Sequence, residues 1–181
     1  VCGSEFASRY FRPGFYETVM KNKGWDHLPY EADFLRFTLS DGAGAALLEN
    51  KPNEKGLSLK IHWIDIRSYA DRFDTCMMAG GINNDGDIQC WSDHASPVEA
   101  AQAGSFILLQ NFSLLKRMIP IWVAHYLDLV NKGKIYVEEL DYLCSHYSSH
   151  SLREETVGLL EKTDAMIDEK KWFSNLSHKG N

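Results

Sequence analysis

The stretch DYLCSHYSSHSLRE, residues 141–154, contains the signals that decide the fold. Its apolar residues 142–144 predict a short buried strand. Ser151, with Glu154 three residues later, forms the capping-box pattern that begins many helices, so we expect a helix over residues 152–167. A strand that is followed closely by a capped helix is typical of an α/β protein with buried sheets.

Further apolar segments extend this pattern. KWFSNLS, residues 171–177, predicts a strand after the helix, and HKGN then begins a polar turn. Upstream, SDGAGAALLEN, residues 40–50, has closely spaced Gly and Ala, which predict a tight turn entering a buried strand over 43–49. LSLKIHWIDIRSY, residues 57–69, alternates apolar and polar side chains and predicts a strand with one buried face. We expect these two upstream strands to form a hairpin.

The middle of the chain combines a long loop and a long helix. Residues 79–97 are rich in Gly, Asn and Asp, and a loop of this length is usually functional or disordered. From Pro97 we expect a long helical region that is broken or kinked near Pro120. Its apolar residues surround it on nearly all sides, which predicts a central, buried helix.

Composition excludes several classes of protein. The chain has 181 residues, of which 44% are hydrophobic, enough for a packed core. A net charge of −6 with both signs scattered does not favour nucleic-acid binding. The apolar run 106–130 is interrupted by polar residues, so we expect no membrane span. Four cysteines without a CxxC pair suit a reducing compartment, and we predict a cytoplasmic protein.

Three separated motifs resemble the β-ketoacyl-acyl-carrier-protein synthase III branch of the thiolase-like condensing enzymes. VCGSEFASR, residues 1–9, looks like the last strand of the family's first half-domain. SDGAGAALLEN is similar to the family's Gly-Asp-Gly-Ala-Gly-Ala signature, with Ser40 in place of the usual Gly. CSHYSSH, residues 144–150, and SHKGN, residues 177–181, resemble its His-bearing loop and its His-Gly-Asn turn.

The resemblance implies a fold and a division of the chain. The fold would be the layered αβαβα arrangement of two similar halves. Residues 1–40 would be the end of the N-terminal half-domain, and residues 41–181 most of the C-terminal half-domain without its last strands. The abrupt start on Val1 agrees with a chain that is part of a longer protein. The family also implies a homodimer.

The same resemblance assigns catalytic roles. His146 and Asn181 match the two non-nucleophilic members of a Cys-His-Asn triad. Two neutral donors of this kind, an imidazole N–H and an amide NH2, suit the stabilisation of an enolate oxygen. The alternative for His146 is a polar residue that is satisfied at a strand end, and for Asn181 a frayed terminus.

The nucleophile should be a thiol, and none of the cysteines matches its motif. Cys2 lies in the first strand and Cys144 in the strand before the histidine, so we expect the family's cysteine upstream of this chain and the chain alone to be inactive. Cys76, which precedes MMAGG, is interpreted as a buried thiol beside two methionines rather than a nucleophile.

Substrate contacts are predicted at the mouth of the helix. The family commonly has an Asn three residues after its catalytic His, in the pantetheine tunnel, and here that position is Ser149. His150 follows it, and we take both as candidate substrate-binding residues. Cys144, His146 and His150 lack a second ligand pair, so we expect no metal and no cofactor apart from acyl-CoA or acyl carrier protein as substrates.

Three functions remain open from the sequence. The first is a condensing enzyme that joins acyl thioesters in a Claisen condensation, and the segment HYSSH makes it more similar to relatives in specialised metabolism, such as polyketide formation, than to fatty acid biosynthesis. The second is an acyltransferase that moves an acyl group to an oxygen or nitrogen acceptor, with His146 as general base. The third is an inactive half-domain that serves in dimerisation or in docking a carrier protein.

Overall fold

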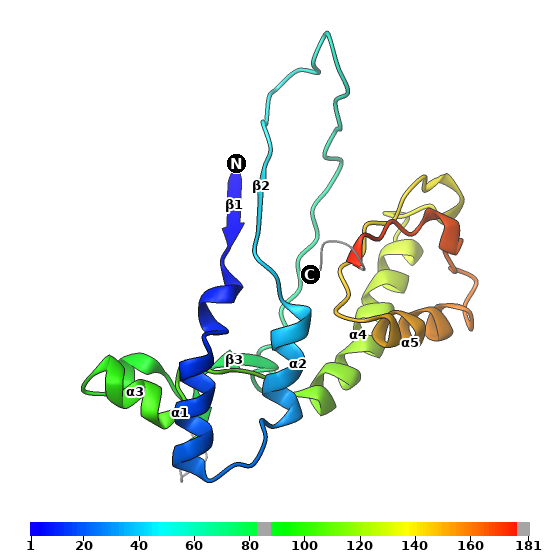
Figure 1. The fold of residues 1–181 in the computed structure, drawn as a ribbon. Coiled ribbons are helices and arrows are strands. Elements are labelled where there is room, and N and C mark those ends of the chain that lie inside the picture. The colour runs from blue at the N-terminus through cyan, green and yellow to red at the C-terminus, as the bar shows by residue number, and fades with distance from the viewer. Residues whose placement is uncertain (83–87, 177–181) are drawn as a thin grey trace.

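The computed structural model describes residues 1–82 and 88–176, and its main elements are shown in Figure 1. Within these ranges the chain forms α-helices and two-stranded antiparallel sheets, so the predicted mixture of helices and strands is present. The helices are α1 Pro13–Lys23, α2 Tyr30–Thr38, α3 Pro97–Ala103, α4 Phe112–Asn131 and α5 His150–Leu160. The sheets pair β1 Cys2–Glu5 with β2 Gly42–Ala45, β3 Met77–Ala79 with β6 Leu108–Gln110, and β4 Gly81–Ile82 with β5 Ile88–Gln89. The layered arrangement of larger sheets stays a prediction.

One group of elements packs α1, α2 and α3 around the β3–β6 ladder. Its buried residues include Tyr16 and Val19 of α1 and Ala32 of α2. Gly104 ends α3 with φ +87, and a Cβ added there would lie 2.7 Å from Cγ2 of Val19. Both the left-handed backbone and the close contact with α1 therefore require glycine at this position.

A second group consists of α4, α5 and the segments that follow each helix. Its core contains Val123 of α4, Val157 and Leu160 of α5, and Ile167 and Trp172 further along. The indole N–H of Trp172 donates to the Ile167 carbonyl at 3.1 Å, so the polar edge of this buried ring is satisfied. In Figure 1 this group lies to one side of the α1–α2–α3 group, and α4 connects the two.

The long helical region expected from Pro97 is interrupted at a different place from the one predicted. Gly104 ends α3 after seven residues, and β6 separates α3 from α4. By contrast, α4 continues through Pro120 as a helix of 20 residues. The side chain of Asn111 accepts from the Leu114 N–H at 3.0 Å and caps the start of α4. The chain is broken by a glycine that can adopt positive φ, not by the proline.

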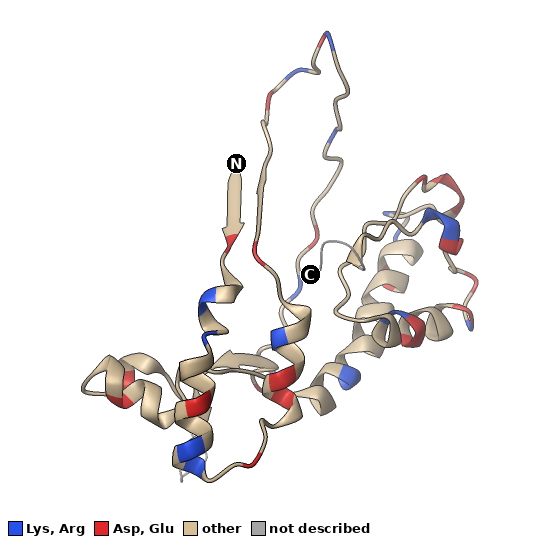
Figure 2. Cartoon of the chain, viewed as in Figure 1, with Lys and Arg blue, Asp and Glu red and all other residues tan. Residues whose placement is uncertain are grey.

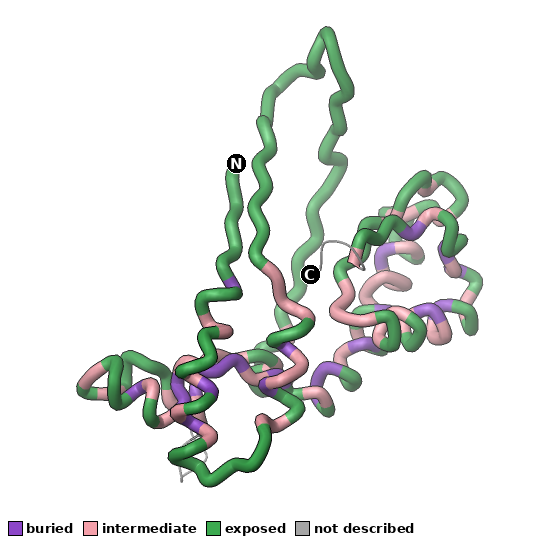
Figure 3. Tube along the Cα trace, viewed as in Figure 1, coloured by how far each residue is buried: buried purple, intermediate pink, exposed green. Residues whose placement is uncertain are grey.

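The expected hairpin between 43–49 and 57–69 is also wrong. β2 pairs with β1, in a register that joins Cys2 to Ala45 and Glu5 to Gly42. Residues 46–69, which we call the arm, extend away from the helices without forming a described strand (Figure 1), and the whole arm is exposed apart from Tyr69 at its end (Figure 3). An alternating pattern needs a surface to cover its apolar face, and no described element supplies one.

The base of the arm is held to α4 by charged groups. Asp65 lies 2.7 Å from Nε2 of His125, and Arg67 pairs with Asp128, which also accepts from Lys132 at 2.8 Å. The contact with Arg67, followed by the contact with Lys132, lowers the pKa of Asp128 to about 2. We call Asp65, Arg67, His125 and Asp128 the clasp. It fixes where the arm leaves the α4–α5 group.

The helix predicted over 152–167 is present but displaced. Its N-cap is Ser149, whose hydroxyl accepts from the Leu152 N–H at 3.3 Å, so α5 begins at His150 rather than after Ser151. It ends at Leu160, whose carbonyl accepts from the Thr163 hydroxyl at 2.7 Å. Ser149, two residues upstream of Ser151, is the N-cap, and the Thr163 hydroxyl satisfies a carbonyl of the last turn.

The strands predicted over 142–144 and 171–177 are reduced to one parallel bridge in the described part of the chain. It joins Leu143 to Trp172. The Leu143 N–H donates to the Lys171 carbonyl at 2.8 Å, and the Phe173 N–H donates to the Leu143 carbonyl at 2.9 Å. Residue 177 lies outside the described residues. The order of extended segment, helix and extended segment agrees with the prediction, and the structure adds that the two extended segments run parallel.

The proposed division at residue 40 is crossed by contacts in this structure. Besides the β1–β2 ladder, the Ser8 hydroxyl and backbone N–H donate to the Asp41 carboxylate at 2.6 and 2.8 Å. Both signs of charge are spread over the helices and the arm (Figure 2). Among the described helices, none is long and apolar enough to cross a bilayer.

Candidate functional site

His146 lies in the short connection between the parallel bridge and α5. The bridge at Leu143 fixes the start of this connection, and the Ser149 cap fixes its end. The side chain of His146 is exposed, and within the described residues it has no hydrogen-bond partner. Both ring nitrogens are therefore available to a ligand, one as a donor and one as an acceptor in the neutral ring.

The parallel bridge aligns the chain around His146 with a second segment. After Leu143 the chain runs on to His146, and after Trp172 it runs on in the same direction through Phe173 to Leu176. A hollow of about 260 Å³ lies between the two segments and is lined by Cys144, Ser145, His146, Tyr147, Phe173, Ser174, Asn175 and Leu176. The bridge therefore brings the His146 connection beside Phe173–Leu176.

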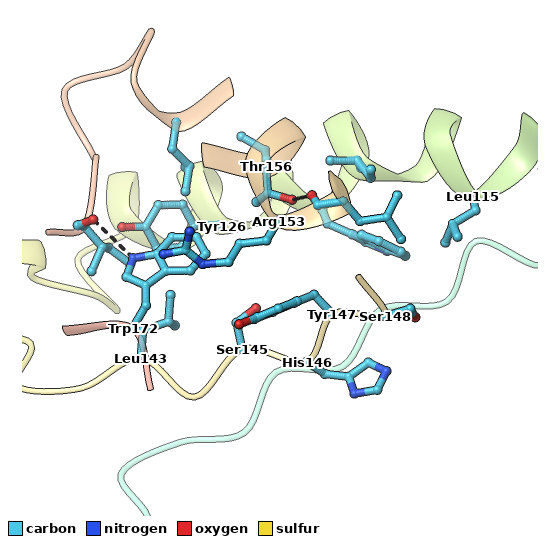
Figure 4. A pocket seen from close by; sticks show the side chains of 16 residues that line it. Leu115, Tyr126, Leu143, Ser145, His146, Tyr147, Ser148, Arg153, Thr156 and Trp172 are labelled. Carbon is cyan, nitrogen blue, oxygen red and sulfur yellow. Dashed lines mark hydrogen bonds between the residues drawn. The ribbon is translucent and has the colours of Figure 1, made fainter. Parts of the chain in front are cut away.

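A larger cavity of about 440 Å³, which shares Ser145, His146 and Tyr147 with the smaller hollow, opens between α4 and α5 (Figure 4). We call it the α4–α5 groove. One face of α4 and one face of α5 form its walls, and Tyr147 and His146 lie at its rim. The residues that define it on the helices are Leu115, Ile119, Trp122, Val123 and Tyr126 of α4 and Leu152, Arg153, Thr156 and Leu160 of α5.

Arg153 is the one permanently charged side chain among the described residues of the groove. Its guanidinium pairs with Glu169 at 2.6 Å and lies 5.0 Å from the centre of the Trp172 ring. These two contacts hold it against the wall (Figure 4). The groove therefore has apolar walls and a cation whose charge is already paired.

Ser149 and His150, the two candidate substrate-binding residues, lie at the start of α5 in this structure. Ser149 is half-buried and uses its hydroxyl for the N-cap. His150 is exposed at the first residue of the helix, with its ring centre 6.4 Å from that of Tyr147. Neither lines the groove or the smaller hollow. Their contact with substrate stays a prediction.

Asn181, the second predicted catalytic residue, lies outside the described residues. The segment that leads to it, Phe173–Leu176, lines the smaller hollow together with His146.

Cys144 and Cys76 are compared as candidates for the nucleophilic thiol. Cys144 is exposed and lines the same hollow as His146. Cys76 is half-buried, and burial raises the pKa of its thiol although Gln110 donates to it at 3.1 Å. A raised pKa disfavours the nucleophilic thiolate, which agrees with the interpretation of Cys76 as a structural residue.

The α4–α5 groove was not predicted from the sequence. Its α4 wall follows a helical spacing, with Leu115, Ile119, Trp122 and Tyr126 at intervals of three or four residues. That signal was present in the sequence, but an all-round apolar helix was expected to be fully enclosed. Trp122 is instead 48% exposed.

No model of a known protein family matches the chain, and no curated protein is significantly similar to it. A functional assignment therefore depends on the motifs and on the geometry around His146.

Proposed function

We propose that this chain belongs to an enzyme that condenses acyl thioesters, of the β-ketoacyl synthase III type, with His146 and Asn181 as its two neutral donors. The observation that carries the proposal is the parallel bridge between Leu143 and Trp172. It brings the His146 connection beside Phe173–Leu176, the described segment that precedes Asn181 in the sequence. The proposal is that one thioester oxygen meets both His146 and Asn181. The layered thiolase-like fold is part of the proposal.

The chemistry needs charge stabilisation at one oxygen. The bond between the malonyl α-carbon and its carboxylate breaks and releases CO2, and the electron pair moves into the thioester as an enolate. The imidazole N–H and the amide NH2 stabilise the enolate oxygen. The enolate carbon then attacks the carbonyl of an acyl group on a cysteine, forms the new carbon–carbon bond and expels the cysteine thiolate. The cysteine that carries the acyl group is not assigned to any of the four cysteines of this sequence.

The partners follow from the same proposal. Acyl-CoA or an acyl carrier protein would supply the thioesters, and two copies would form a homodimer in the cytoplasm. No metal or other cofactor takes part in this reaction scheme.

An acyltransferase on the same scaffold is the second candidate, and one observation favours it. His146 is exposed and has no hydrogen-bond partner in the described part of the chain, so a ring nitrogen can accept a proton from an external hydroxyl or amine. The acyl group would then pass to that oxygen or nitrogen without loss of CO2.

Release of CO2 from a malonyl thioester separates the two candidates. The protein, as its gene encodes it, is mixed with acyl-CoA and labelled malonyl thioester, and labelled CO2 is measured. We expect His146→Ala to lower the rate by about a hundredfold or more, as loss of one such donor does in other enzymes. The matched control is His27→Ala, at an exposed histidine that lines neither the α4–α5 groove nor the smaller hollow, and it should keep the rate.

Absence of CO2, together with acyl transfer to an added amine or alcohol that His146→Ala abolishes, would replace condensation by the second candidate. Full activity of His146→Ala in both assays would reject both.

A further inference from the structure

A third hollow lies at the β3–β6 ladder, in the group that packs α1, α2 and α3. Its volume of about 530 Å³ is within the range of pockets that hold small ligands. It is bordered by the end of α1, the connection 24–29, the start of α2 and the start of α4, and Figure 1 shows β3 between α1 and α2. We call it the ladder hollow. His146 does not line it, so a ligand here would be independent of the condensing function.

The ladder hollow has an apolar floor that the core holds in place. Val19 of α1 and Ile107 are 2% and 3% exposed. Met78 of β3 and Leu109 of β6 also line the hollow, and they are partners in the antiparallel register. An aromatic ring can cover such a floor without losing hydrogen bonds to water.

Gln110 adds one buried hydrogen-bond acceptor to this floor. The residue is 7% exposed, and its Nε2 donates to the Cys76 carbonyl at 2.9 Å and to the Cys76 Sγ at 3.1 Å. Both donor contacts go to Cys76, whereas no group in the described part of the chain donates to the Oε1 of Gln110. Because Gln110 lines the hollow, a ligand N–H there would satisfy a polar atom that has little access to water.

Two side chains of opposite charge lie at one end of the hollow. α1 ends at Lys23 and α2 begins at Tyr30, so the short connection 24–29 keeps Lys23 and Glu31 at adjacent ends of the two helices. Neither has an ion-pair partner among the described residues. A ligand with only one sign of charge would be attracted by one of them and repelled by the other, whereas a zwitterion complements both.

The connection between these charges carries an aromatic side chain. Gly24 ends α1 with φ +64, and the backbone N–H of Trp25 donates to the Met20 carbonyl at 2.9 Å. This turn fixes Trp25 at the end of α1, where its indole lines the hollow. A ligand ring can stack on or pack edge-to-face against that indole.

We propose that the ladder hollow binds a zwitterionic aromatic amino acid whose ring carries an N–H donor, the chemistry of free tryptophan. The carboxylate would pair with Lys23 and the ammonium with Glu31. The ring would lie on the floor formed by Ile107 and Leu109, and its N–H would donate to the Oε1 of Gln110.

A ligand series tests each of these contacts with L-tryptophan as the probe. Binding to the protein, as its gene encodes it, is measured by calorimetry. The benzothienyl analogue, in which sulfur replaces the ring N–H, should bind about five- to tenfold more weakly. Tryptamine lacks the carboxylate and indole-3-propionate lacks the ammonium, and each should bind about two- to fivefold more weakly. Equal affinity for all four, or no binding of L-tryptophan at millimolar concentration, would overturn the proposal.

Charge variants show which side chain meets which end of the ligand. Lys23→Gln and Glu31→Gln should each lower the affinity for L-tryptophan about two- to fivefold. Lys23→Gln should not weaken tryptamine, and Glu31→Gln should not weaken indole-3-propionate, because the matching ligand group is already absent. The controls Lys21→Gln and Glu17→Gln change exposed residues of α1 that do not line the hollow, and they should keep the affinity. Equal losses in the variants and the controls would contradict these pairings and with them the proposal.

An obstructing pair on α4 locates the ligand. Ser113→Trp places a large ring at the exposed rim of the ladder hollow and should lower the affinity for L-tryptophan at least tenfold. Lys116→Trp adds the same ring at an exposed position of α4 outside the hollow and should keep the affinity. Ser113→Tyr is a smaller obstruction, for use if circular dichroism shows that Ser113→Trp is unfolded. Binding that neither Ser113 variant weakens would place the ligand elsewhere and reject the site.

Discussion

The arm and the α4–α5 group carry similarly strong apolar patterns, yet only one of them is packed. In the arm, Leu57 and Leu59 are 87% and 86% exposed, whereas Ile119 of α4 and Ile167 beyond α5 are each 1% exposed. Two helices can bury facing stripes against each other, but an alternating strand needs a sheet and a covering layer. Apolar periodicity therefore states what a segment can bury, and the surrounding elements decide whether it does.

The largest expected effect is the difference in stability between a substitution in the α4–α5 core and one in the arm. Ile167→Ala should lower the free energy of unfolding by about 2–5 kcal/mol, because it removes buried methyl groups and leaves a cavity in the α4–α5 core. Ile66→Ala in the arm, where the side chain is 87% exposed, should change it by no more than about 0.5 kcal/mol. Urea unfolding measures both. Equal losses would show that the arm is packed in solution.

A second comparison uses two glycines. Gly104→Ala should destabilise the protein by about 1–3 kcal/mol, because φ is +87 and the new Cβ would meet Val19 at 2.7 Å. Gly14→Ala, in α1 with nothing within 4 Å of the added Cβ, should stabilise it by about 0.5–1 kcal/mol. Thermal unfolding should show a lower melting temperature for Gly104→Ala and a higher one for Gly14→Ala. A neutral Gly104→Ala would reject the close packing of α1 against the end of α3.

The clasp gives a pH-dependent prediction at the base of the arm. The pKa of Asp128 is lowered from 3.8 to about 2, first by the hydrogen bond from Arg67 and then by that from Lys132. Because the folded-state pKa lies below the unfolded one, its contribution is fully present above pH 4 or so and is lost as the pH falls through about 2. We expect Arg67→Gln to move the Asp128 midpoint upward toward 3.8, as carboxyl-carbon NMR can measure. An unchanged midpoint would mean that the arm base is not held by this pair.

The smallest expected effect is at the wall of the groove. Arg153→Gln should cost less than about 1 kcal/mol, since its partner Glu169 is 50% exposed and its charge is screened by water. Thermal unfolding at low and high salt measures the pair, and the difference from the parent protein should shrink as salt rises. A loss as large as that of Ile167→Ala would contradict the view that packing, rather than charge, stabilises this group.

The sequence predicted helices and extended segments better than it predicted which segments pair with one another. It placed a helix after the His146 connection, because a serine cap is a local signal, although it chose Ser151 instead of Ser149. It predicted an extended segment on either side of that helix, and the structure joins the two by a single parallel bridge at Leu143 and Trp172. The pairing of β2 with β1 was missed, because register depends on which distant backbone is available.

The candidate site shows the same limit. His146 was singled out from its motif, and its place at two hollows follows from the bridge and the Ser149 cap. The α4–α5 groove depends on how the faces of two helices meet, which no single segment specifies. Helical spacing places Trp122 on the apolar face of α4. Whether that face is covered or lines a groove depends on where the neighbouring helix lies.

The central claim is that His146 and Asn181 act as a unit on one oxygen, and a double-mutant comparison of CO2 release tests it most directly. The single variants His146→Ala and Asn181→Ala should each reduce the rate strongly, and the double variant should be no more than a few-fold slower than the worse of the two, because residues that act together lose their effect together. Loss in the double variant equal to the product of the two single losses, or no loss in either single variant, would contradict it.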